Sequence, residues 1–405
     1  MASALKPVNE ALHDILAALP NCGEEMVALQ DAFGRSLAKD VIAGTHHPLA
    51  NMSAMDGFAV RASDTKSDKP LHIIGESAAG HPFTSALSEG EAVRIYTGAY
   101  MPEGSDCVLL QEDALIDGDK VRTSEPINAG RFVRLKGQDF ARDDVILPAG
   151  HLMTSRSIAL CALALQSRVS VIKKPRIALL SSGDELVPMG ALPRFGQLIN
   201  SNSVFLAHIL RKWGAEVTDL GILSDEQGAL HKAIEDPSVF DLIITTGGAS
   251  VGAHDHIVGD LTMNDKNALS FWKIAMRPGK PLISGKIDNT AFIGLPGNPV
   301  SVAICSLIFL MPIMAHFSKR DDLSLSFIDA ISDSDLAEND QREDYLRGTA
   351  YQDDKGLWHI KAFNKQDSAL LGRMARANAI LIRKPFAPAL AAGETVKMAL
   401  LPEGF

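Results

Sequence analysis

Residues able to bind an anion follow a short apolar segment at 241–244. There the chain reads TTGGASVGAHD over residues 245–255. Paired glycines let backbone N–H groups approach an anion closely, and hydroxyls add further donors, as a phosphate-binding loop requires. A glycine pair alone would indicate an ordinary turn. The full string instead predicts an anion-binding loop, with Asp255 placed where a carboxylate could hold a cation.

Acidic residues follow another apolar segment, 177–180, in the string SSGDEL. Adjacent carboxylates at the end of a strand can hold Mg²⁺, which takes oxygen ligands and keeps several waters. In isolation, Asp184 or Glu185 would be expected to cap a helix. Asp225, which follows the apolar segment 221–223, is a candidate third carboxylate, although alone it would be an ordinary turn residue.

A basic group, Lys273, Arg277 and Lys280, lies in the string WKIAMRPGKP at 272–281. The prolines restrict the directions that these cations can take, and arginine can bind an oxyanion through two parallel hydrogen bonds. The alternative is a basic surface loop, which would be preferred if the acidic and glycine-rich strings were missing. The sequence therefore predicts an oxyanion site in an otherwise acidic protein.

The string GLPGNPVS at 294–301 places Pro299 in the first turn of an apolar helix. The N–H groups and positive dipole end of that helix could meet an anion, although a tight strand-to-helix turn would also explain the string. His254 and His256 are too few for a zinc prediction. No CxxC pair is formed by the scattered cysteines, which is typical of reduced structural thiols: Cys22, Cys107, Cys161 and Cys305.

The elements that must position these strings alternate between strand and helix from Lys173 to about Lys319. That rhythm predicts a parallel α/β sheet with crossover helices. Ligands of such sheets bind beyond the carboxyl ends of the strands. The loops after the strands are therefore where chemistry is expected.

The flanking segments predict further domains. An apolar stripe from Val8 to Leu19 predicts a helix that ends near Pro20. Short β-rich pieces with Gly and Pro predict an inserted domain, and short strands between polar turns predict a small terminal β domain. The expected organisation is a linking domain at 1–45 plus 140–172, the insertion at 46–139, the central α/β domain at 173–320 and the terminal domain at 321–405.

Composition argues against several protein classes. The 405 residues carry a net charge of −10, whereas non-specific nucleic-acid binding needs a basic face. The N-terminal segment lacks a secretory pattern. Ala291–Phe317 lacks Asp, Glu, Lys and Arg, but its apolar run after Pro299 gives about 24 Å of helix, short of a ~30 Å membrane core, and Pro312 interrupts it. We expect a buried core helix and a cytoplasmic protein without nucleic-acid or membrane partners.

Two further strings precede these four. They are SAMDGFAV, which begins at Ser53, and TGAYMPEGSDCVLLQE, which begins at Thr97. Together, and in this order along the chain, the six strings resemble those of the molybdopterin molybdenumtransferase family, which includes the C-terminal domain of gephyrin. The resemblance spans essentially the whole chain.

This resemblance implies a multidomain α/β and β fold. Its parts are a central parallel α/β domain like those that bind molybdopterin, a β-rich inserted domain and a small C-terminal domain like a β-barrel. It also implies an elongated homodimer in which 1–45 and 140–172 serve dimerisation. The active cleft would lie between the central domain of one subunit and the β-rich parts of the other.

The resemblance also implies a reaction. The family inserts molybdate, a co-substrate, into adenylylated molybdopterin, with Mg²⁺-dependent hydrolysis and release of AMP. In physical terms this is metal-assisted phosphoryl chemistry beside an oxyanion site. Further implied partners are the adenylyltransferase of the pathway and the recipient molybdoenzymes.

Matched residue by residue, the resemblance implies two sets of site residues. The catalytic acids are Asp56, Asp139, Glu185, Asp225 and Asp255, of which Glu185 and Asp255 are expected to carry the metal. The substrate-binding set is Thr97, Ser182, Gly183, Thr246, Gly247, Gly248, Ser250, Gly252, Lys273, Arg277, Lys280, Pro296, Pro299, Arg347 and Ser368. Lys273 and Arg277 are hypothesised to receive molybdate or phosphate.

Some positions depart from the pattern of the family. Asn51-Met52 stands where Asp-Asn is usual, Phe58 where Tyr is common, and Asp367 where Gly is usual. Two other functions remain open: an adenylyltransferase of the same pathway, whose fold resembles the central domain, and a dimeric scaffold. ATP consumption with bare molybdopterin would identify the first. Against the second, a scaffold has no use for clustered, mutually repelling carboxylates.

Overall fold

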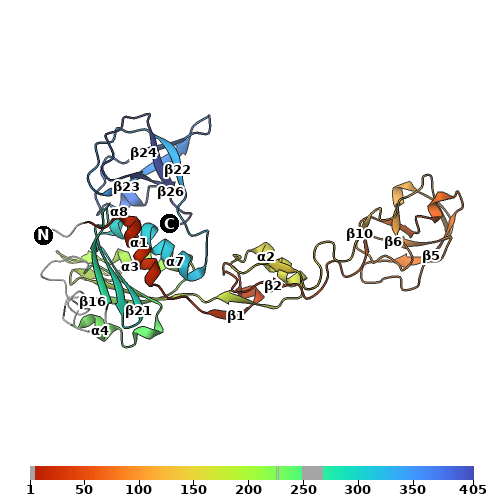
Figure 1. Cartoon of the computed structure of the whole chain (residues 1–405), viewed down its shortest axis with the longest axis horizontal. Coiled ribbons are helices and arrows are strands. Elements are labelled where there is room, and N and C mark those ends of the chain that lie inside the picture. The colour runs from red at the N-terminus through yellow and green to blue at the C-terminus, as the bar shows by residue number, and fades with distance from the viewer. Residues whose placement is uncertain (1–4, 225, 227, 249–267) are drawn as a thin grey trace. The chain divides into compact units, whose positions relative to one another are not determined.

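The computed structural model describes residues 5–224, 226, 228–248 and 268–405 (Figure 1). The chain forms two compact units. The first unit contains Met1–Glu25 together with Ile172–Phe405, and the second unit contains Met26–Val171. The second unit is thus an insertion into the chain of the first.

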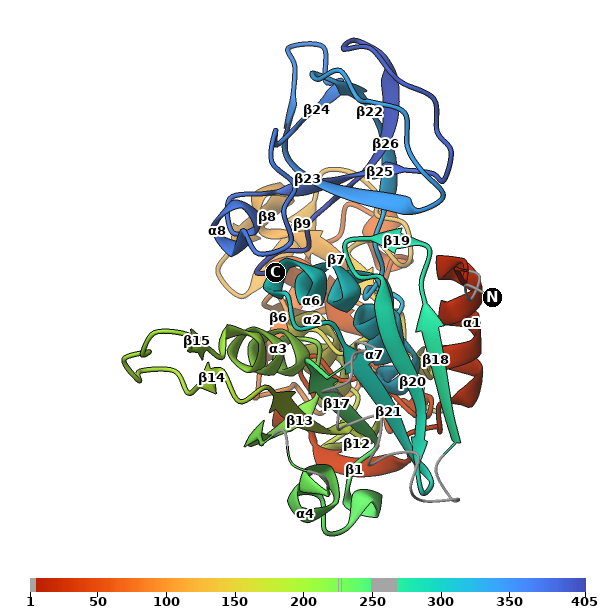
Figure 2. The ribbon, with the colours of Figure 1, turned by 90° about the vertical axis from the view of Figure 1, so that its left-hand side faces the viewer.

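A six-stranded sheet forms the centre of the first unit (Figure 2). Its strand order is β16 (Glu216–Leu223), β13 (Arg176–Ser182), β17 (Leu242–Thr246), β21 (Thr290–Leu295), β20 (Pro281–Ile287) and β18 (Ala268–Lys273). The first four strands run parallel, which confirms the predicted parallel α/β arrangement. β20 runs antiparallel to both of its neighbours, because only Asp288 and Asn289 separate it from β21 and no crossover helix fits between them.

Helices pack on this sheet. α3 (Ser201–Lys212) begins where the side chain of Asn200 accepts the N–H of Ser203, and α4 (Ala229–Ala233) follows β16. α1 (Val8–Ala18) buries Ala11 and Ile15. The apolar stripe read from the sequence is therefore the face that α1 buries.

The apolar segment after β21 is one helical run in three parts. They are α6 (Pro299–Cys305), a π-helical turn at Ser306–Leu310 and α7 (Met311–Ser318). Pro299–Ser318 is long and apolar enough to cross a membrane, with a mean hydropathy of 2.1, but 83% of its most apolar window is buried within the protein. α1 packs against α7. The segment is therefore a core helix, as predicted. The expected interruption at Pro312 was wrong, because the helical run continues through it and is 20 residues long.

The terminal part of the first unit is a closed barrel. Its strands are β22 (Phe327–Ser332), β23 (Glu343–Gln352), β24 (Trp358–Ala362), β25 (Ala379–Arg383) and β26 (Thr395–Leu400). They pair in the order β23-β24-β22-β26-β25, and β25 pairs back onto β23. β19 (Met276–Arg277) also pairs with β23, and α8 (Leu371–Met374) precedes β25. This closure confirms the predicted barrel-like domain.

The second unit is mostly β. Its largest sheet has the order β7 (Cys107–Leu110), β4 (Gly57–Val60), β6 (Glu91–Ile95), β5 (Leu71–Ser77), β9 (Lys120–Thr123) and β8 (Ala114–Asp117). Short pairs are β1 (Glu24–Ala28) with β12 (Arg168–Ile172), β2 (Val41–Ile42) with β11 (Val145–Leu147), and β3 (Met52–Ser53) with β10 (Val133–Arg134). Thr154 caps α2 (Ser155–Leu163). The multidomain α/β and β fold class is thus as predicted, whereas the domain boundaries and the homodimer stay predictions.

Candidate functional site

One edge of the central sheet gathers four of the predicted loops. The register pairs Ser181 with Thr246 and Thr246 with Leu295, so β13, β17 and β21 end side by side. β20 runs in the opposite direction, which places its first residue, Pro281, and the partner of that residue, Lys273, at the same edge. The acidic, glycine-rich, basic and GLPGNPVS strings therefore start from one edge, where α/β sheets bind ligands.

The start of the glycine-rich loop accepts only glycine. Gly247 has a φ of +78°, and a Cβ built on it would lie 2.4 Å from the carbonyl oxygen of Ser182. Gly248 also has a positive φ, of +65°. Thr246 Oγ1 donates to Ser181 Oγ at 3.1 Å, which ties the ends of β17 and β13 together. The remaining predicted residues of this loop lie outside the described residues: Ser250, Gly252 and Asp255.

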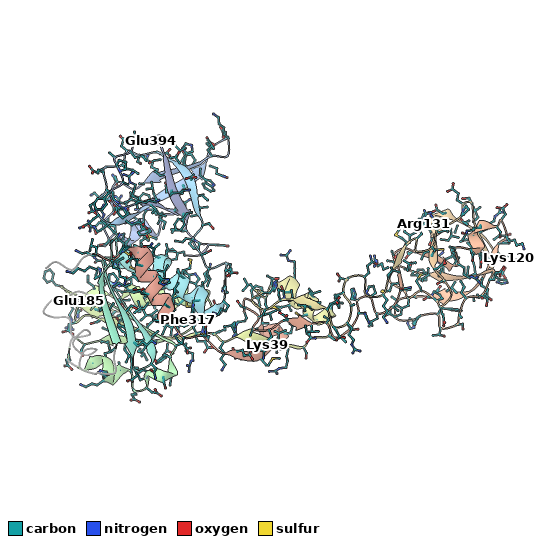
Figure 3. All side chains as sticks on the ribbon, in the orientation of Figure 1. Lys39, Lys120, Arg131, Glu185, Phe317 and Glu394 are labelled. Atoms are coloured by element: carbon teal, nitrogen blue, oxygen red, sulfur yellow. The ribbon has the colours of Figure 1, made fainter. Side chains whose placement is uncertain are left out.

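The acidic loop exposes Glu185 to solvent (Figure 3). Gly183 has a φ of +146°, and a Cβ built on it would lie 2.5 Å from Glu185 Oε2, so the carboxylate lies over this glycine. The carbonyl of Glu185 accepts the N–H of Leu198 at 2.7 Å, which ties the loop to β15 (Leu198–Ile199). The third candidate acid, Asp225, lies outside the described residues.

A magnesium site at this edge would depend on Glu185. Among the residues that the structure describes, no three His, Cys, Asp or Glu side chains are grouped so that they could bind a metal ion. Mg²⁺ commonly uses only one or two carboxylates because it keeps several waters, and Glu185 supplies the oxygen chemistry that it prefers. Glu185 therefore fits this ion as one ligand, and its predicted co-ligand Asp255 lies outside the described part of the chain.

The basic loop holds Arg277 against carboxylates. Its guanidinium forms an ion pair with Asp344, lies 3.6 Å from Asp340 and donates to Asn339 Oδ1 at 3.3 Å. Asp344 is 4% exposed, so Arg277 offsets the charge of a buried carboxylate. The pKa of Asp340 falls to about 2, first through its hydrogen bonds from Arg342. An oxyanion at Arg277 would therefore compete with two carboxylates of the protein.

Lys273 and Lys280 lie at the two ends of this loop. The N–H of Ile274 donates to the Lys280 carbonyl at 2.7 Å, which closes the loop on itself. Gly279 has a φ of +112°, and a Cβ built on it would lie 2.7 Å from Cys305 Sγ, so the loop packs closely on the core helix. Both ammonium groups consequently start from the ligand edge of the sheet.

The prolyl turn at 296–299 joins this edge to the barrel. Asn298 Nδ2 donates to Ser368 Oγ at 3.0 Å, and the N–H of Val300 donates to the Ser368 carbonyl at 3.1 Å. These bonds place a predicted barrel residue beside the first turn of α6. The structure thus brings Ser368 to the turn that contains Pro299, and Pro296 lies three residues earlier in the same segment.

Arg347, on β23, is a buried cation near that turn. It is 1% exposed, and burial lowers its pKa to about 10. Its Nη2 donates to the Asp367 carbonyl at 3.1 Å, while its Nε has no hydrogen-bond partner among the described residues. An unpartnered donor of this kind is unfavourable until a ligand or a movement supplies an acceptor. Asp367 does not adopt a positive φ, so the backbone accommodates the loss of the glycine usual in the family.

Asp56 and Thr97 meet in the second unit. Asp56 Oδ1 accepts the N–H of Thr97 at 2.7 Å and its hydroxyl at 2.8 Å. The bond from the Thr97 N–H is the largest cause of the lowered pKa of Asp56, followed by the hydroxyl, and Arg94 adds to it. Arg94 lies over the ring of Phe58, with Cζ 4.9 Å from the ring centroid. The pair presents an exposed, ionised carboxylate.

Asp139 is also exposed in the second unit, where its N–H donates to the His47 carbonyl at 3.0 Å. No hydrogen bond or ion pair joins it to Asp56 within the described second unit. Nearby, Asn51 Oδ1 accepts the N–H of Lys136 at 3.0 Å. Asn51, one of the departures from the family pattern, therefore orders the segment that leads to Asp139.

The sequence analysis did not identify several residues that hold the predicted site residues in place. Asn298 stands next to Pro299 and Gln366 stands two positions before Ser368, so closeness in the sequence was a usable signal for both. Asp344 gives no such signal, because it lies 67 positions after its partner Arg277. The role of Arg94 likewise gives no signal in the sequence, because it depends on the pairing of β4 with β6, which brings Arg94 over Phe58.

Known families match three consecutive parts of the chain. Residues 6–164 match the MoeA N-terminal region (domain I and II), residues 178–316 match a probable molybdopterin binding domain, and residues 329–401 match the MoeA C-terminal region (domain IV). Together these matches follow the order of the second unit, the central sheet and the barrel.

Whole-length relatives agree with this division. A molybdopterin molybdenumtransferase of Haemophilus influenzae is 35% identical over 375 residues, which cover 92% of each chain. One from Nostoc is 32% identical over 390 residues, or 93% of this chain and 89% of the relative. The solved structure of the molybdopterin biosynthesis MoeA protein from Pyrococcus horikosii is 26% identical, with a TM-score of 0.86 over 98% of this chain and 99% of its own. The chain belongs to the molybdopterin molybdenumtransferase family, the transferases of molybdenum-cofactor biosynthesis.

Proposed function

We propose that this protein carries out the final step of molybdenum-cofactor synthesis. It inserts molybdate into adenylylated molybdopterin, with Mg²⁺-dependent hydrolysis and release of AMP. The observation that carries the proposal is the common edge of the sheet from which the acidic, glycine-rich and basic loops start. The similarity to relatives named molybdopterin molybdenumtransferase supports it.

The phosphates are bound by backbone N–H groups in this proposal. The residues proposed for this role are Ser182, Gly183, Thr246 and Gly248, with Ser250 and Gly252 further along the same string. The N–H of Gly247 donates to the Leu295 carbonyl at 3.2 Å, so this glycine shapes the turn. The glycines are needed because a side chain at Gly247 would meet the carbonyl of Ser182. Water adds to one phosphorus atom, the bridging P–O bond breaks, and AMP leaves while the other phosphate stays on the pterin side chain.

Molybdate is bound by the cations nearby. Lys273, Arg277 and Lys280 attract it to the edge of the sheet, and Arg347 and Ser368 complete the oxyanion site beside the prolyl turn. The unpartnered Nε of Arg347 supports this role, because an oxyanion would supply the missing acceptor.

The acids have two sources. Glu185 and Asp255 would hold Mg²⁺, which when bound polarises a phosphoryl oxygen, and Asp225 adds a third carboxylate to that group. Asp56 and Asp139 belong to the second unit, and we propose that a homodimer brings them to the cleft of the other subunit. The lowered pKa of Asp56 keeps its carboxylate ionised, so it can accept a hydrogen bond from the attacking water.

We also propose a cytoplasmic protein that receives its substrate from the adenylyltransferase of the pathway and passes the cofactor to molybdoenzymes. Its cysteines support a reducing compartment: Cys107, Cys161 and Cys305 are buried and form no disulfide. Burial raises the pKa of the Cys305 thiol to about 12, which keeps it unreactive.

The test is AMP release from adenylylated molybdopterin by purified protein with Mg²⁺, in the presence and absence of molybdate. Release that depends on molybdate supports the insertion reaction. Reaction of ATP with bare molybdopterin instead would support the adenylyltransferase, and no reaction in either assay would support a scaffold.

Asp255→Asn sharpens this test. We expect it to abolish AMP release while the oligomeric state and the melting temperature stay near wild type, because its role is charge at a metal and not packing. Wild-type turnover in this variant would remove Asp255 from the mechanism.

A further inference from the structure

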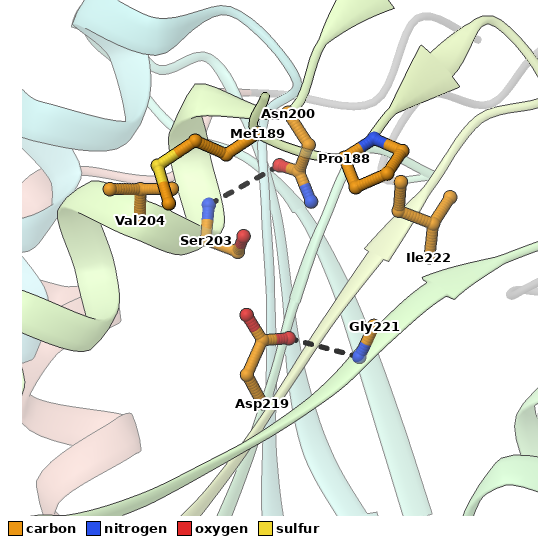
Figure 4. A pocket seen from close by; sticks show the side chains of 8 residues that line it. All are labelled: Pro188, Met189, Asn200, Ser203, Val204, Asp219, Gly221 and Ile222. Carbon is orange, nitrogen blue, oxygen red and sulfur yellow. Dashed lines mark hydrogen bonds between the residues drawn. The ribbon is translucent and has the colours of Figure 1, made fainter. Parts of the chain in front are cut away.

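A pocket of about 540 Å³ opens beside the acidic loop (Figure 4). It is formed by the end of β16, the start of α3 and the segment after β14 (Leu186–Val187). Ile222, which lines it, pairs with Ser181, so the pocket borders the ligand edge of the sheet. Its volume is in the range of small-molecule sites.

The walls of the pocket are largely apolar. Pro188 and Met189 come from the segment between β14 and β15, Val204 comes from α3, and Ile222 comes from β16. Figure 4 shows these side chains around one space, with Val204 and Ile222 on opposite sides of it. Apolar faces of this kind pack well against a flat ring system.

One carboxylate faces this space. Asp219 Oδ1 accepts the N–H of Gly221 at 2.9 Å, which orients the side chain, and its Oδ2 has no hydrogen-bond partner among the described residues. In Figure 4 the carboxylate points toward Ser203 across the pocket. Asn200 is already used, since its Oδ1 accepts from the N–H of Ser203 at 3.3 Å and from the hydroxyl of Ser181 at 3.2 Å. Asp219 therefore offers a carboxylate oxygen to the pocket, across from the hydroxyl of Ser203.

We propose that this pocket binds the pterin ring of the substrate and that Asp219 recognises its 2-amino-4-oxo edge. That edge presents an amino N–H and a ring N–H side by side, and a carboxylate can accept both. Adenine presents one amino group next to a ring acceptor, which a second carboxylate oxygen would repel. The proposal rests on the proposed function and adds a subsite for the heterocycle of the same substrate.

The place of the pocket suits an extended ligand. The strand order puts β16, which carries the pocket, two strands from β17, which carries the glycine-rich loop. At about 4.8 Å per strand this separation is roughly 10 Å. A ring bound over β16 would thus direct its phosphate arm along the edge toward the glycine-rich loop.

Binding of simple pterins to the full-length protein tests the subsite without turnover. The two probes are pterin, which is 2-amino-4-oxopteridine, and lumazine. In lumazine a carbonyl replaces the 2-amino group of pterin. We expect the wild-type protein to bind pterin about tenfold more tightly than lumazine, by quenching of pteridine fluorescence. Asp219→Asn should remove this preference, because an amide N–H then faces the N–H groups of the ring.

Asp236→Asn is the matched control. Asp236 is exposed and accepts the N–H of Ser238 at 2.9 Å, as Asp219 accepts that of Gly221, but it does not line the pocket. This variant should keep the wild-type preference. In turnover, Asp219→Asn should raise KM for adenylylated molybdopterin about tenfold and leave kcat near wild type.

Two results would overturn the subsite: equal affinity of the wild-type protein for pterin and lumazine, or displacement of pterin by adenosine at comparable affinity. The AMP-release assay separates this failure from failure of the proposed function. Molybdate-dependent release without a pterin preference removes the subsite alone. Pterin preference without any release removes the reaction and keeps the binding site.

Discussion

The side-chain amide of Gln366 pairs with the backbone of Arg347 in both directions. Gln366 Oε1 accepts the N–H of Arg347 at 3.0 Å, and its Nε2 donates to the carbonyl of Arg347 at 2.9 Å. The same Nε2 donates to the Phe363 carbonyl at 2.8 Å. Gln366 therefore fixes the strand position that carries the buried guanidinium.

Replacing Gln366 by Ala should weaken molybdate binding without touching the cation itself. Loss of the paired hydrogen bonds should lower the free energy of unfolding by about 1–2 kcal/mol. We also expect a higher molybdate concentration for half-maximal AMP release. Gln352→Ala is the control, because its amide donates to the Gly356 carbonyl at 3.4 Å on an exposed part of the same strand. An unchanged molybdate dependence in Gln366→Ala would exclude this positioning role.

Gly247→Ala should disrupt the glycine-rich turn for two reasons. The positive φ disfavours any Cβ by roughly 1–2 kcal/mol, and this Cβ would also lie 2.4 Å from the Ser182 carbonyl oxygen. Gly356→Ala isolates the first effect, since Gly356 has a φ of +77° and nothing within 4 Å of an added Cβ. Thermal unfolding should show a larger loss for Gly247→Ala, together with loss of AMP release. Equal losses would mean that the turn relaxes freely.

Thr97→Val should raise the pKa of Asp56. The variant removes the hydroxyl donor and keeps the backbone donor, so the carboxylate loses part of what stabilises its charged form. Asp56 is ionised above its pKa, so a higher pKa moves the acid limb of kcat/KM to higher pH. NMR titration of the carboxyl carbon would measure the shift directly. Thr123→Val, which removes a hydroxyl bonded to the Glu125 carbonyl, should leave both profiles unchanged.

His359 should make the barrel more stable in mild acid. Its Nδ1 lies 2.9 Å from Asp333 and its Nε2 lies 3.6 Å from Asp353, and the bond to Asp333 is the largest cause of its raised pKa. A raised folded-state pKa stabilises the protein fully below the unfolded value of about 6.5, and this contribution is lost as pH rises through the folded value.

The measurement is urea unfolding of wild type and His359→Gln across a pH series from about 5.5 to about 8.5, on both sides of the unfolded pKa. The wild-type advantage should be largest at the acid end and shrink toward the alkaline end. An advantage that grows with pH would contradict the assignment. His208→Gln is a control, since its Nδ1 lies 3.0 Å from the Val204 carbonyl and no ion pair involves it among the described residues.

Elements whose pattern lies within one segment were predictable. The stripe from Val8 to Leu19 became α1, and the uncharged run after Pro299 became the core helix. The alternation of strand and helix signals also placed the start of the acidic and glycine-rich strings at the ends of β13 and β17, and crossover connections bring such carboxyl ends to one edge.

Features that depend on distant pairing were not predictable in this way. β19 joins β23 of the barrel, and this pairing sets Arg277 against Asp344. From the sequence alone Arg277 is a cation in a basic loop, and no local pattern indicates that Asp344 is its partner. Closure of the barrel, in which β25 pairs with β23, was also not predictable, because no local sequence pattern indicates which strand edges pair.

The inserted position of the second unit affects how the chain can fold. The N–H of Lys173 donates to the Gly23 carbonyl at 2.8 Å, so the outgoing and returning segments meet at one place. α1 packs against α7 and β20, and both elements follow the whole insertion in the chain. The insertion is the loop that must close before Gly23 and Lys173 can meet. The entropic cost of closing it rises only slowly with its length, and a folded insertion lowers that cost because it brings the two ends closer. α1 is thus synthesised before the insertion but can pack only after it, against α7 of the apolar run Pro299–Ser318.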